Sequence, residues 1–261
     1  MGLTHRSCGK GVNKESFHRA SDKADFVIAL AGNPNTGKST VFNALTGLHQ
    51  HTGNWPGKTV LRAEGRYINQ GQVYHLVDLP GTYSLLANSV EEQVARDYLC
   101  FHKPDATVVV VDATCLERNL NLVLQVLEIT PKVVVCVNLI DEAKRKKIRL
   151  DIEKLSNHLG VPVVATAARD GEGLEQLIQT IAQVVNGTIK TTPFQVKYEE
   201  KIERAVAHLE PLIKQLVGTD FNTRWLALRL LDQDEVVIKA LRKHLKQREV
   251  FTPSIGGELW A

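Results

Sequence analysis

An apolar run followed at once by a glycine-rich segment constrains this chain most strongly. Residues 26–31 read Phe-Val-Ile-Ala-Leu-Ala, and residues 32–39 read Gly-Asn-Pro-Asn-Thr-Gly-Lys-Ser. The second segment matches G-x-x-x-x-G-K-[ST], a loop between a strand and a helix whose backbone N–H groups surround a phosphate. Residues 41–45 have a helical pattern, and a helix starting near Ser39 would add its positive end to the site. The sequence therefore predicts a nucleoside triphosphate site.

The side chains of this phosphate loop have separate predicted roles. Lys38 is expected to reach the β- and γ-phosphates, which makes it a predicted catalytic residue, and the Ser39 hydroxyl is expected to bind Mg²⁺. The other loop residues expected to line the nucleotide are Asn33, Pro34, Asn35, Thr36, Gly37 and Thr40.

A second motif, Asp78-Leu79-Pro80-Gly81, ends an apolar run over residues 73–77. It matches D-x-x-G, in which the aspartate holds Mg²⁺ through a water and the glycine N–H bonds the γ-phosphate. Asp78 is therefore a predicted metal ligand, and Gly81 a predicted catalytic residue.

Two further segments indicate which nucleotide base the site accepts. Asn138-Leu139-Ile140-Asp141 matches N-x-x-D, and the Asp141 carboxylate can accept from the N1–H and 2-amino groups of guanine, donors that adenine lacks. Thr166-Ala167-Ala168 would place the Ala167 N–H on guanine O6. An isolated N-x-x-D usually marks a strand-to-helix turn with Asp as N-cap. Here the N-x-x-D motif follows the two phosphate motifs in the chain, and this order favours GTP over ATP.

Composition is that of an ordinary globular protein. The length of 261 residues predicts one large domain or two unequal ones, and 43% hydrophobic residues suffice for a sizeable core. The net charge of +3 is too small to indicate nucleic-acid binding by itself. Four widely spaced cysteines predict reduced thiols. No apolar stretch approaches ~18 residues, so no membrane span is expected.

Strand and helix patterns alternate over residues 25–187. Residues 61–68 and 73–77 flank Asn69-Gln70-Gly71-Gln72, a turn signal that predicts an antiparallel hairpin. Residues 49–59 are polar and are expected to form a long mobile loop. Later strand runs are rich in β-branched residues, as in parallel strands buried on both faces, and alternate with helical patterns. We predict an α/β P-loop GTPase fold: a doubly wound, mostly parallel sheet with one antiparallel strand. The later strand runs are 107–111, 132–137 and 161–165, and the helical patterns are 91–101, 117–129, 151–159 and 174–185.

From residue 188 the strand signal disappears. Thr191-Thr192-Pro193 marks a linker, and apolar residues then recur at spacings of three and four over 202–216, 225–231 and 235–245. We therefore expect a GTPase domain at residues 25–187 and a small all-helical domain at 188–250. The tails, 1–24 and 251–261, receive no predicted role.

Four segments together resemble the cytosolic N-terminal part of the ferrous-iron transport protein B (FeoB) family of bacteria. G-N-W-P-G and D-L-P-G-T-Y are unusual among GTPases, and the resemblance runs over residues 25–245. It implies a GTPase domain joined to a helical domain that in related proteins favours the GDP-bound state. The segments are residues 32–39, Gly53-Asn54-Trp55-Pro56-Gly57-Lys58-Thr59-Val60, Asp78-Leu79-Pro80-Gly81-Thr82-Tyr83-Ser84-Leu85 and Arg224-Trp225-Leu226-Ala227-Leu228.

The resemblance also implies partners and a location. Both domains would precede a polytopic membrane domain that carries Fe²⁺, at the cytoplasmic face of the bacterial inner membrane. This chain is expected to be a soluble fragment of that protein, and a homo-oligomer is possible.

Three residue roles follow from the resemblance. Thr59, in the segment called switch I, would complete Mg²⁺ coordination beside Ser39 when GTP is bound, which makes it a further predicted catalytic residue. Asn35 matches an asparagine that in potassium-activated members helps to hold K⁺ near the phosphates; its alternative role is that of a turn residue without an ion. Trp55 either lies over the nucleotide or packs against the protein.

Two departures from the pattern of Ras-like enzymes bear on GTP hydrolysis and nucleotide release. Thr82 follows Gly81 where Ras-like enzymes have the glutamine that orients water, and no arginine finger can be assigned. Hydrolysis should therefore be slow, on the order of 10⁻² s⁻¹ or below. Leu139 stands where many relatives have a lysine along the base, so GDP release should be fast.

Three function classes remain open. The first, which we predict, is the GTPase switch of an Fe²⁺ transporter. The second is a soluble RNA-associated GTPase of ribosome or tRNA maturation, which would need a basic module. Lys144-Arg145-Lys146-Lys147 is interpreted instead as a solvated helix face, and no nucleic-acid partner is expected. The third is a module that binds nucleotide without turnover, as Thr82 suggests.

Overall fold

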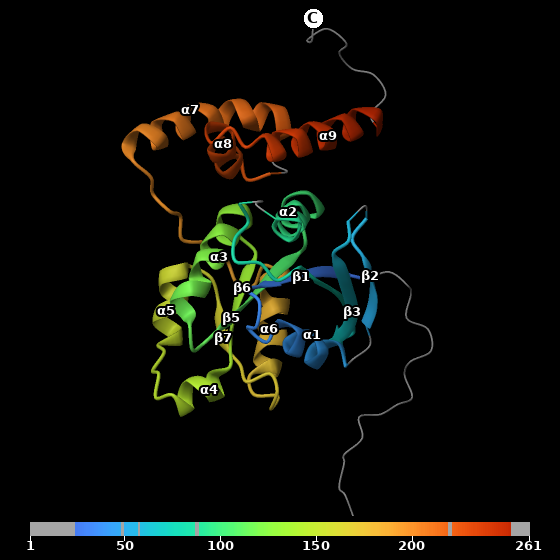
Figure 1. Ribbon diagram of the computed structural model, residues 1–261, viewed down its shortest axis with the longest axis vertical. Helices are drawn as coiled ribbons and strands as arrows, with labels where there is room; N and C mark the ends of the chain where they lie inside the picture. The colour runs from blue at the N-terminus through green and yellow to red at the C-terminus, as the bar shows by residue number, and fades with distance from the viewer. Residues whose placement is uncertain (1–23, 48–49, 57, 87–88, 219–220, 252–261) are drawn as a thin grey trace, which may run out of the picture.

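A seven-stranded sheet in the order β2-β3-β4-β1-β5-β6-β7 forms the centre of the protein (Figure 1). The computed structural model describes residues 24–47, 50–56, 58–86, 89–218 and 221–251. Only β3 runs against its neighbours, so the prediction of a mostly parallel sheet with one antiparallel strand is confirmed. The strands are β1 (Phe26–Gly32), β2 (Gln50–Asn54), β3 (Leu61–Asn69), β4 (Gln72–Asp78), β5 (Ala106–Asp112), β6 (Val133–Asn138) and β7 (Val163–Ala165).

Strand β2 corrects the sequence analysis, which predicted a mobile loop over residues 49–59. It pairs antiparallel with β3, from Gln50 opposite Gly65 to Asn54 opposite Leu61. The side chains of residues 51–54 are exposed, so the backbone ladder rather than apolar burial holds this edge strand. A search for apolar alternation could not detect it. His49 and Gly57, which the prediction included, lie outside the described residues.

The predicted hairpin between β3 and β4 is confirmed. Its two turn residues, Gln70 and Gly71, have φ angles of 51° and 79°. Positive φ at both positions is the backbone of a type I′ turn, whose twist suits a two-residue hairpin. The sheet therefore has two antiparallel pairs, one more than predicted.

Helices cover both faces of the sheet, as a doubly wound fold requires. Alternate residues of β1 enter opposite cores: Ile28 and Leu30 lie in the cluster under α1 and α6, and Ala29 and Ala31 lie in the cluster under α2 and α3. The predicted helix over 91–101 is divided, because one π-helical turn, η1, follows α2. The helices are α1 (Lys38–Thr46), α2 (Val90–Asp97), η1 (Tyr98–His102), α3 (Leu116–Ile129), α4 (Ile140–Arg145), α5 (Ile152–Leu159) and α6 (Leu174–Val185).

The C-terminal part is helical, as predicted, and consists of α7 (Glu200–Val217), α8 (Thr223–Leu231) and α9 (Glu235–Phe251). Figure 1 shows it stacked on the side of the sheet that carries α2 and α3. Trp225 and Val237 belong to the same buried cluster as residues of α2 and α3. The C-terminal helical part and the part that contains the sheet therefore share a hydrophobic core. None of the helices in the described ranges is long and apolar enough to span a bilayer.

Arg224 organises the linker and the start of the helical part. Its Nη1 and Nη2 donate to the Glu203 carboxylate at 2.8 and 2.7 Å, and Nη2 also donates to the carbonyl of Val196 at 3.0 Å. The two bonds from Arg224 to Glu203, and one from the Tyr198 N–H, lower the pKa of Glu203 to about 2. The Tyr198 hydroxyl donates to Glu128 of α3 at 2.9 Å, which ties the linker to the sheet part.

Three of the four cysteines lie in the described part of the chain. Cys100 and Cys136 are buried, Cys115 is exposed, and all three are free thiols. They agree with the predicted reduced state. Burial raises the pKa of the Cys136 thiol to about 12, so this side chain packs as a small apolar group.

Candidate functional site

The predicted phosphate loop joins β1 to α1 and presents backbone N–H groups. Asn35 and Gly37 have φ angles of 66° and 78°, and a left-handed backbone in such a loop turns successive N–H groups inward. Within the described ranges, the N–H groups of residues 35–40, which include Ser39 and Thr40, donate to no protein acceptor. The first helical bond runs from the Val41 N–H to the Gly37 carbonyl, at 3.0 Å. This loop can therefore surround an anion at the positive end of α1.

Two glycines of the loop are needed for close packing. A Cβ on Gly32 would lie 2.6 Å from the carbonyl oxygen of Val110, and a Cβ on Gly37 would lie 2.3 Å from Nδ2 of Asn138. Both distances are too short for a side chain. The backbone of the loop therefore packs directly on β5 and on Asn138.

Asn138 joins three of the four segments that the sequence analysis assigned to the nucleotide. It is 1% exposed, and its Nδ2 donates to the Thr36 carbonyl at 3.0 Å. Its Oδ1 accepts from the Thr166 hydroxyl and from the Ala168 N–H, both at 3.1 Å. The phosphate loop, the end of β6 and residues 166–168 therefore form one site.

Asn33 and Pro34 lie at the start of the loop. Asn33 is 1% exposed, and both polar atoms of its side chain lack a hydrogen-bond partner among the described residues. Its carbonyl accepts from the Thr36 hydroxyl at 2.9 Å. The Asn33 side chain is buried, so its contact with the nucleotide stays a prediction.

Leu139 and Asp141 follow Asn138 at the start of α4. Leu139 has a φ of 62°, and Asp141 lies in the first turn with its carboxylate 28% exposed. Nη2 of Arg145 lies 3.2 Å from that carboxylate, which restrains it without burying it. Asp141 can therefore still accept hydrogen bonds from a base.

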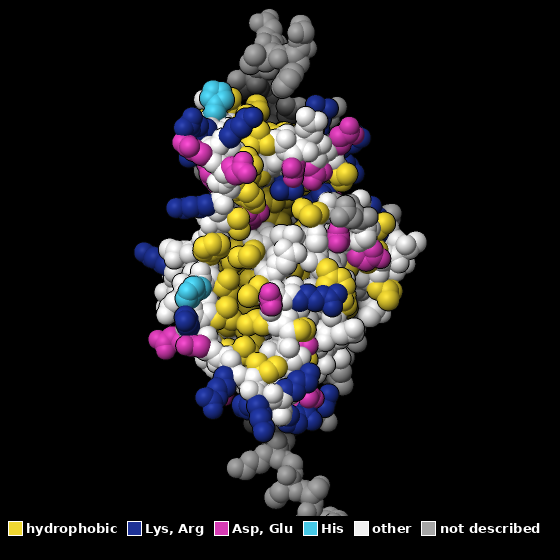
Figure 2. Space-filling view, turned by 60° about the vertical axis from the view of Figure 1, so that its left-hand side comes forward, with side chains coloured by type: hydrophobic (Ala, Val, Ile, Leu, Met, Phe, Trp, Pro, Cys, Tyr) yellow, Lys and Arg dark blue, Asp and Glu magenta, His cyan; other side chains and the backbone are white. Residues whose placement is uncertain are grey.

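The basic run after Asp141 is exposed, as predicted. On the face shown in Figure 2, Lys and Arg side chains gather at the lower end, where Figure 1 places α4. Arg145 pairs with Asp141 and Glu142, and Lys144 lies 2.8 Å from Glu172. Part of this charge is therefore balanced by neighbouring carboxylates.

The Ala167 N–H is engaged differently from the prediction. It donates to the Glu172 carbonyl at 3.0 Å, and Ala167 is 2% exposed. In this conformation it is not available to guanine O6, and the bridge to Glu172 would have to open first. The O6 contact therefore stays a prediction.

Lys38 and Asp78 are brought together. Nζ of Lys38 pairs with the Asp78 carboxylate and donates to the Leu79 carbonyl at 2.8 Å. The side chains of Lys38 and Asp78 are 10% and 18% exposed. Burial raises the pKa of Asp78, and the Lys38 ammonium opposes this rise. The residues predicted for the phosphates and for Mg²⁺ thus adjoin each other.

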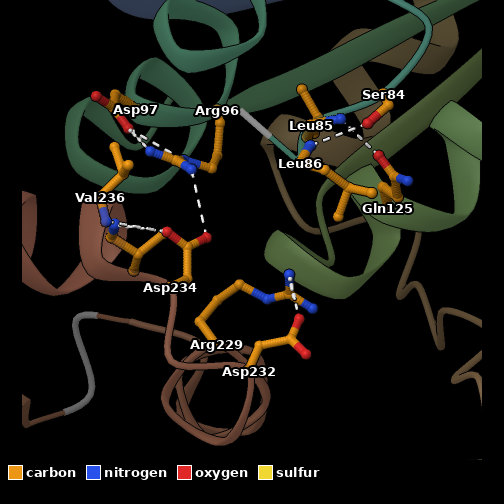
Figure 3. Close-up of polar contacts among 11 residues, drawn as sticks. Ser84, Leu85, Leu86, Arg96, Asp97, Gln125, Arg229, Asp232, Asp234 and Val236 are labelled. Carbon is orange, nitrogen blue, oxygen red and sulfur yellow. Dashed lines mark hydrogen bonds and ion pairs between the residues drawn. The ribbon is translucent and has the colours of Figure 1, made fainter. Parts of the chain in front are cut away.

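Residues 81–86 lie against both the phosphate loop and α3. A Cβ on Gly81 would be 3.5 Å from Pro34, and the Thr82 N–H donates to the Gly32 carbonyl at 3.3 Å. Further along, the Leu85 N–H donates to Oε1 of Gln125 at 2.6 Å (Figure 3). Gly81 therefore lies beside the loop, its contact with the γ-phosphate stays a prediction, and Thr82 is buried.

Thr59 is not brought to the site. It is exposed in the turn between β2 and β3, where the Trp55 N–H donates to the Val60 carbonyl at 2.9 Å. No hydrogen bond joins Thr59 to Ser39 or Asp78 in the part of the chain that the structure describes. The Mg²⁺ contact of Thr59 therefore remains a prediction for another nucleotide state.

Trp55 packs against the protein in this conformation, as one of its two predicted roles requires, and a position over the nucleotide stays a prediction for a state in which switch I has moved. It is 6% exposed and meets Tyr98 of η1 edge-on, with ring centroids 5.3 Å apart. The guanidinium of Arg62 lies 4.9 Å from the centre of the indole ring. Switch I is thus attached to the segment that follows α2.

The oxygen donors at the site suit Mg²⁺. A hydroxyl from Ser39 and a carboxylate from Asp78 leave room for phosphate oxygens and waters, which Mg²⁺ retains in nucleotide sites. Among the described residues, no group of three or more His, Cys, Asp and Glu side chains forms a separate metal cage. Asn35 is exposed at the loop, so its side-chain oxygen is open to a monovalent ion.

Comparison with known proteins identifies relatives of both parts of the chain. The family model of ferrous iron transport protein B matches residues 26–181, and that of the FeoB cytosolic helical domain matches residues 198–253. The Fe(2+) transporter FeoB of Escherichia coli K12 is 39% identical over 220 residues. A Porphyromonas gingivalis Fe(2+) transport protein A/FeoB fusion protein is 39% identical over 212 residues.

These two relatives are much longer than this chain. The alignment with the E. coli protein covers 79% of this chain and 27% of that protein, and the P. gingivalis alignment covers 80% and 25%. This chain therefore spans about a quarter of their length.

Solved structures agree with the fold. The cytosolic domain of the T. maritima FeoB iron transporter in its apo form superposes with a TM-score of 0.76 at 39% identity, covering 83% of this chain and 85% of that chain. The GMPPNP form of the same domain gives a TM-score of 0.75 at 36% identity, covering 88% of each chain.

Proposed function

Because the chain belongs to the ferrous iron transport protein B family, we propose that it is the GTP-binding and GTP-hydrolysing cytosolic part of a bacterial Fe²⁺ transporter. The observation that carries the proposal is the bond from Asn138 to Thr36, which joins a phosphate loop to a guanine-type base motif. The GDP and GMPPNP forms of the T. maritima relative support guanine nucleotide as the ligand.

We assign the two activities to separate parts of the chain. Residues 25–187 form the proposed GTPase domain, and residues 188–250 form the proposed regulatory helical domain. The matches of separate family models to the two parts support this division.

The proposed reaction uses groups already gathered at the loop. Lys38 leaves Asp78 and contacts the β- and γ-phosphates, while N–H groups of the loop and of Gly81 hold the phosphate oxygens. Ser39, Asp78 and, after movement of switch I, Thr59 would hold Mg²⁺, which neutralises charge on those oxygens. Asn35 would help to hold K⁺.

Turnover without a partner should be slow. Thr82 is buried at the position where Ras-like enzymes orient the attacking water, and its backbone N–H is already bonded to Gly32. The intrinsic rate is expected on the order of 10⁻² s⁻¹ or below. Asp141 selects guanine, and Leu139 at the base permits fast GDP release.

The membrane domain of the same full-length protein is the proposed partner, at the cytoplasmic face of the inner membrane. The names of the relatives support this context. An RNA-associated GTPase remains the alternative. RNA retention by this chain in a pull-down at physiological salt would favour the alternative, and no retention favours the transporter.

Phosphate release from GTP and from ATP tests the proposal. Slow phosphate release is expected from GTP and none from ATP. Lys38→Ala should abolish release and nucleotide binding, because the phosphates lose their nearest cation. Lys201→Ala, which removes an exposed lysine of α7, is the matched control and should behave as wild type. Equal release from ATP, or normal release by Lys38→Ala, would contradict the assigned site.

A further inference from the structure

Two side chains of α3 contact the segment of residues 81–86, which lies beside the phosphate loop. Oε1 of Gln125 accepts from the Leu85 N–H at 2.6 Å (Figure 3). The guanidinium of Arg118 lies 4.3 Å from the centre of the Tyr83 ring, which is within the range of a cation–π contact. Segment 81–86 is thus tied to α3 through a backbone N–H group and through an aromatic ring.

Helix α3 is itself held firmly on the sheet part. Its Leu122 side chain is buried in the core, and Oδ1 of Asn119 accepts from the Asp112 N–H at the end of β5, at 2.7 Å. Gln125 follows Arg118 by about two helical turns, so the two side chains lie on the same side of the helix. Contacts from a fixed helix position a neighbouring segment more precisely than contacts from a loop.

The other end of segment 81–86 is held by the phosphate loop. The Thr82 N–H donates to the Gly32 carbonyl at 3.3 Å. A Cβ on Gly81 would lie 3.5 Å from Pro34. At the far end Leu85 is 6% exposed, so its burial adds to its hydrogen bond. Gly81 therefore lies in a stretch of backbone that is fixed both by the phosphate loop and by α3.

This double attachment bears on hydrolysis, because Thr82 is buried where Ras-like enzymes place the glutamine that orients water. Stabilisation of the transition state then depends more heavily on backbone N–H groups, among them the proposed γ-phosphate contact of Gly81. Such groups act strongly only when they are held in place before the reaction. A displacement of about 1 Å can lower the rate by about 100-fold.

We propose that Gln125 and Arg118 are positioning residues for GTP hydrolysis, which hold segment 81–86 so that the Gly81 N–H meets the γ-phosphate. The inference rests on the proposed GTPase function. Both side chains act through the segment rather than on the nucleotide itself. Loss of either contact should therefore slow the chemical step and leave nucleotide binding unchanged.

The first test is GTP hydrolysis by the whole chain with Gln125→Leu, which keeps the size of the side chain and removes the acceptor. The kcat should fall by about tenfold with KM unchanged, the pattern of an interaction needed in the transition state alone. GDP and GMPPNP should bind as they do to wild type. The matched control is Gln176→Leu, the same substitution at an exposed position of α6 on the other face of the sheet, and its kcat should equal that of wild type.

Conservative variants separate positioning from a purely structural role. Gln125→Glu keeps an acceptor for the Leu85 N–H, so its kcat should be close to that of wild type. Tyr83→Phe keeps the ring beside Arg118 and should also hydrolyse GTP normally, whereas Tyr83→Ala should be slowed with KM unchanged. If Gln125→Leu fails to fold, the two Tyr83 variants carry the same test.

An unchanged or raised kcat in Gln125→Leu would overturn the inference, because the contact would then be irrelevant to the reaction or would hold the segment away from it. A raised KM with an unchanged kcat would overturn it as well, since the effect would lie in nucleotide binding. Equal losses of kcat in Gln125→Leu and Gln125→Glu would show that the acceptor is not what matters. Absence of GTP hydrolysis by the wild-type chain would instead contradict the proposed function.

Discussion

Nδ2 of Asn138 donates to the carbonyl oxygen of Thr36 at 3.0 Å, between residues 102 positions apart in sequence. The phosphate loop is therefore held from the end of β6, and the same side chain holds residues 166–168 through its oxygen. The shape of the phosphate loop thus depends on the segments predicted to bind the guanine base.

Asn138→Ala should weaken both stability and nucleotide binding. The substitution removes three buried hydrogen bonds and leaves the Thr36 carbonyl and the Ala168 N–H without this partner. The free energy of unfolding should fall by about 2–4 kcal/mol in urea denaturation. Asn121→Ala, at an exposed position of α3, should change it by less than about 0.5 kcal/mol. Equal effects of the two substitutions would show that Asn138 does not hold the loop.

Glu203→Gln should change the acid stability of the chain. The pKa of Glu203 is lowered to about 2 from an ordinary 4.5, so its bonds to Arg224 stabilise the fold above the ordinary value and are lost as pH falls through the lower one. The variant should melt at a lower temperature than wild type near neutral pH, and the difference should vanish toward about pH 2. Melting followed by circular dichroism measures this.

The control for this prediction is Glu200→Gln, which removes an exposed helix ion pair with Arg204. Surface pairs of this kind contribute little, so its melting temperature should follow wild type at every pH. A difference between Glu203→Gln and wild type that did not depend on pH would rule out the ion pair as its cause.

Asn35→Gly should remove the potassium response of GTP hydrolysis. Asn35 has a φ of 66°, which glycine adopts without strain, so the substitution removes the side-chain oxygen and keeps the loop. Wild type should release phosphate faster in K⁺ than in Na⁺ at equal ionic strength, and the variant should bind GTP but show one rate in both salts. Identical wild-type rates in the two salts would exclude a potassium mechanism.

The sequence predicted the sheet and most of the site because both depend on local patterns. The apolar runs of β1, β5 and β6 are nearly continuous, and the loop from Gly32 to Ser39 has fixed spacing. Strand β2 was missed because its exposed residues carry no apolar period. What holds it is hydrogen bonding to β3, which composition does not reveal.

Contacts between distant segments could not be predicted in the same way. The bridge from Ala167 to Glu172 depends on how the backbone turns after β7. The approach of Arg96 to Asp234 depends on how the helical part docks on α2. In the sequence Arg96 is one charged residue on a helix among several, and only tertiary packing makes it buried.

The measurement that tests guanine recognition most directly is a titration of Asp141→Asn with GDP and with xanthosine diphosphate. The carboxylate accepts from two guanine donors, whereas the amide can donate to the 2-oxo group of xanthine. GDP affinity should fall by about 100-fold or more while xanthosine diphosphate affinity rises. Glu142→Gln, which alters the neighbouring partner of Arg145, should bind GDP as wild type does. Unchanged GDP affinity in Asp141→Asn would contradict the account.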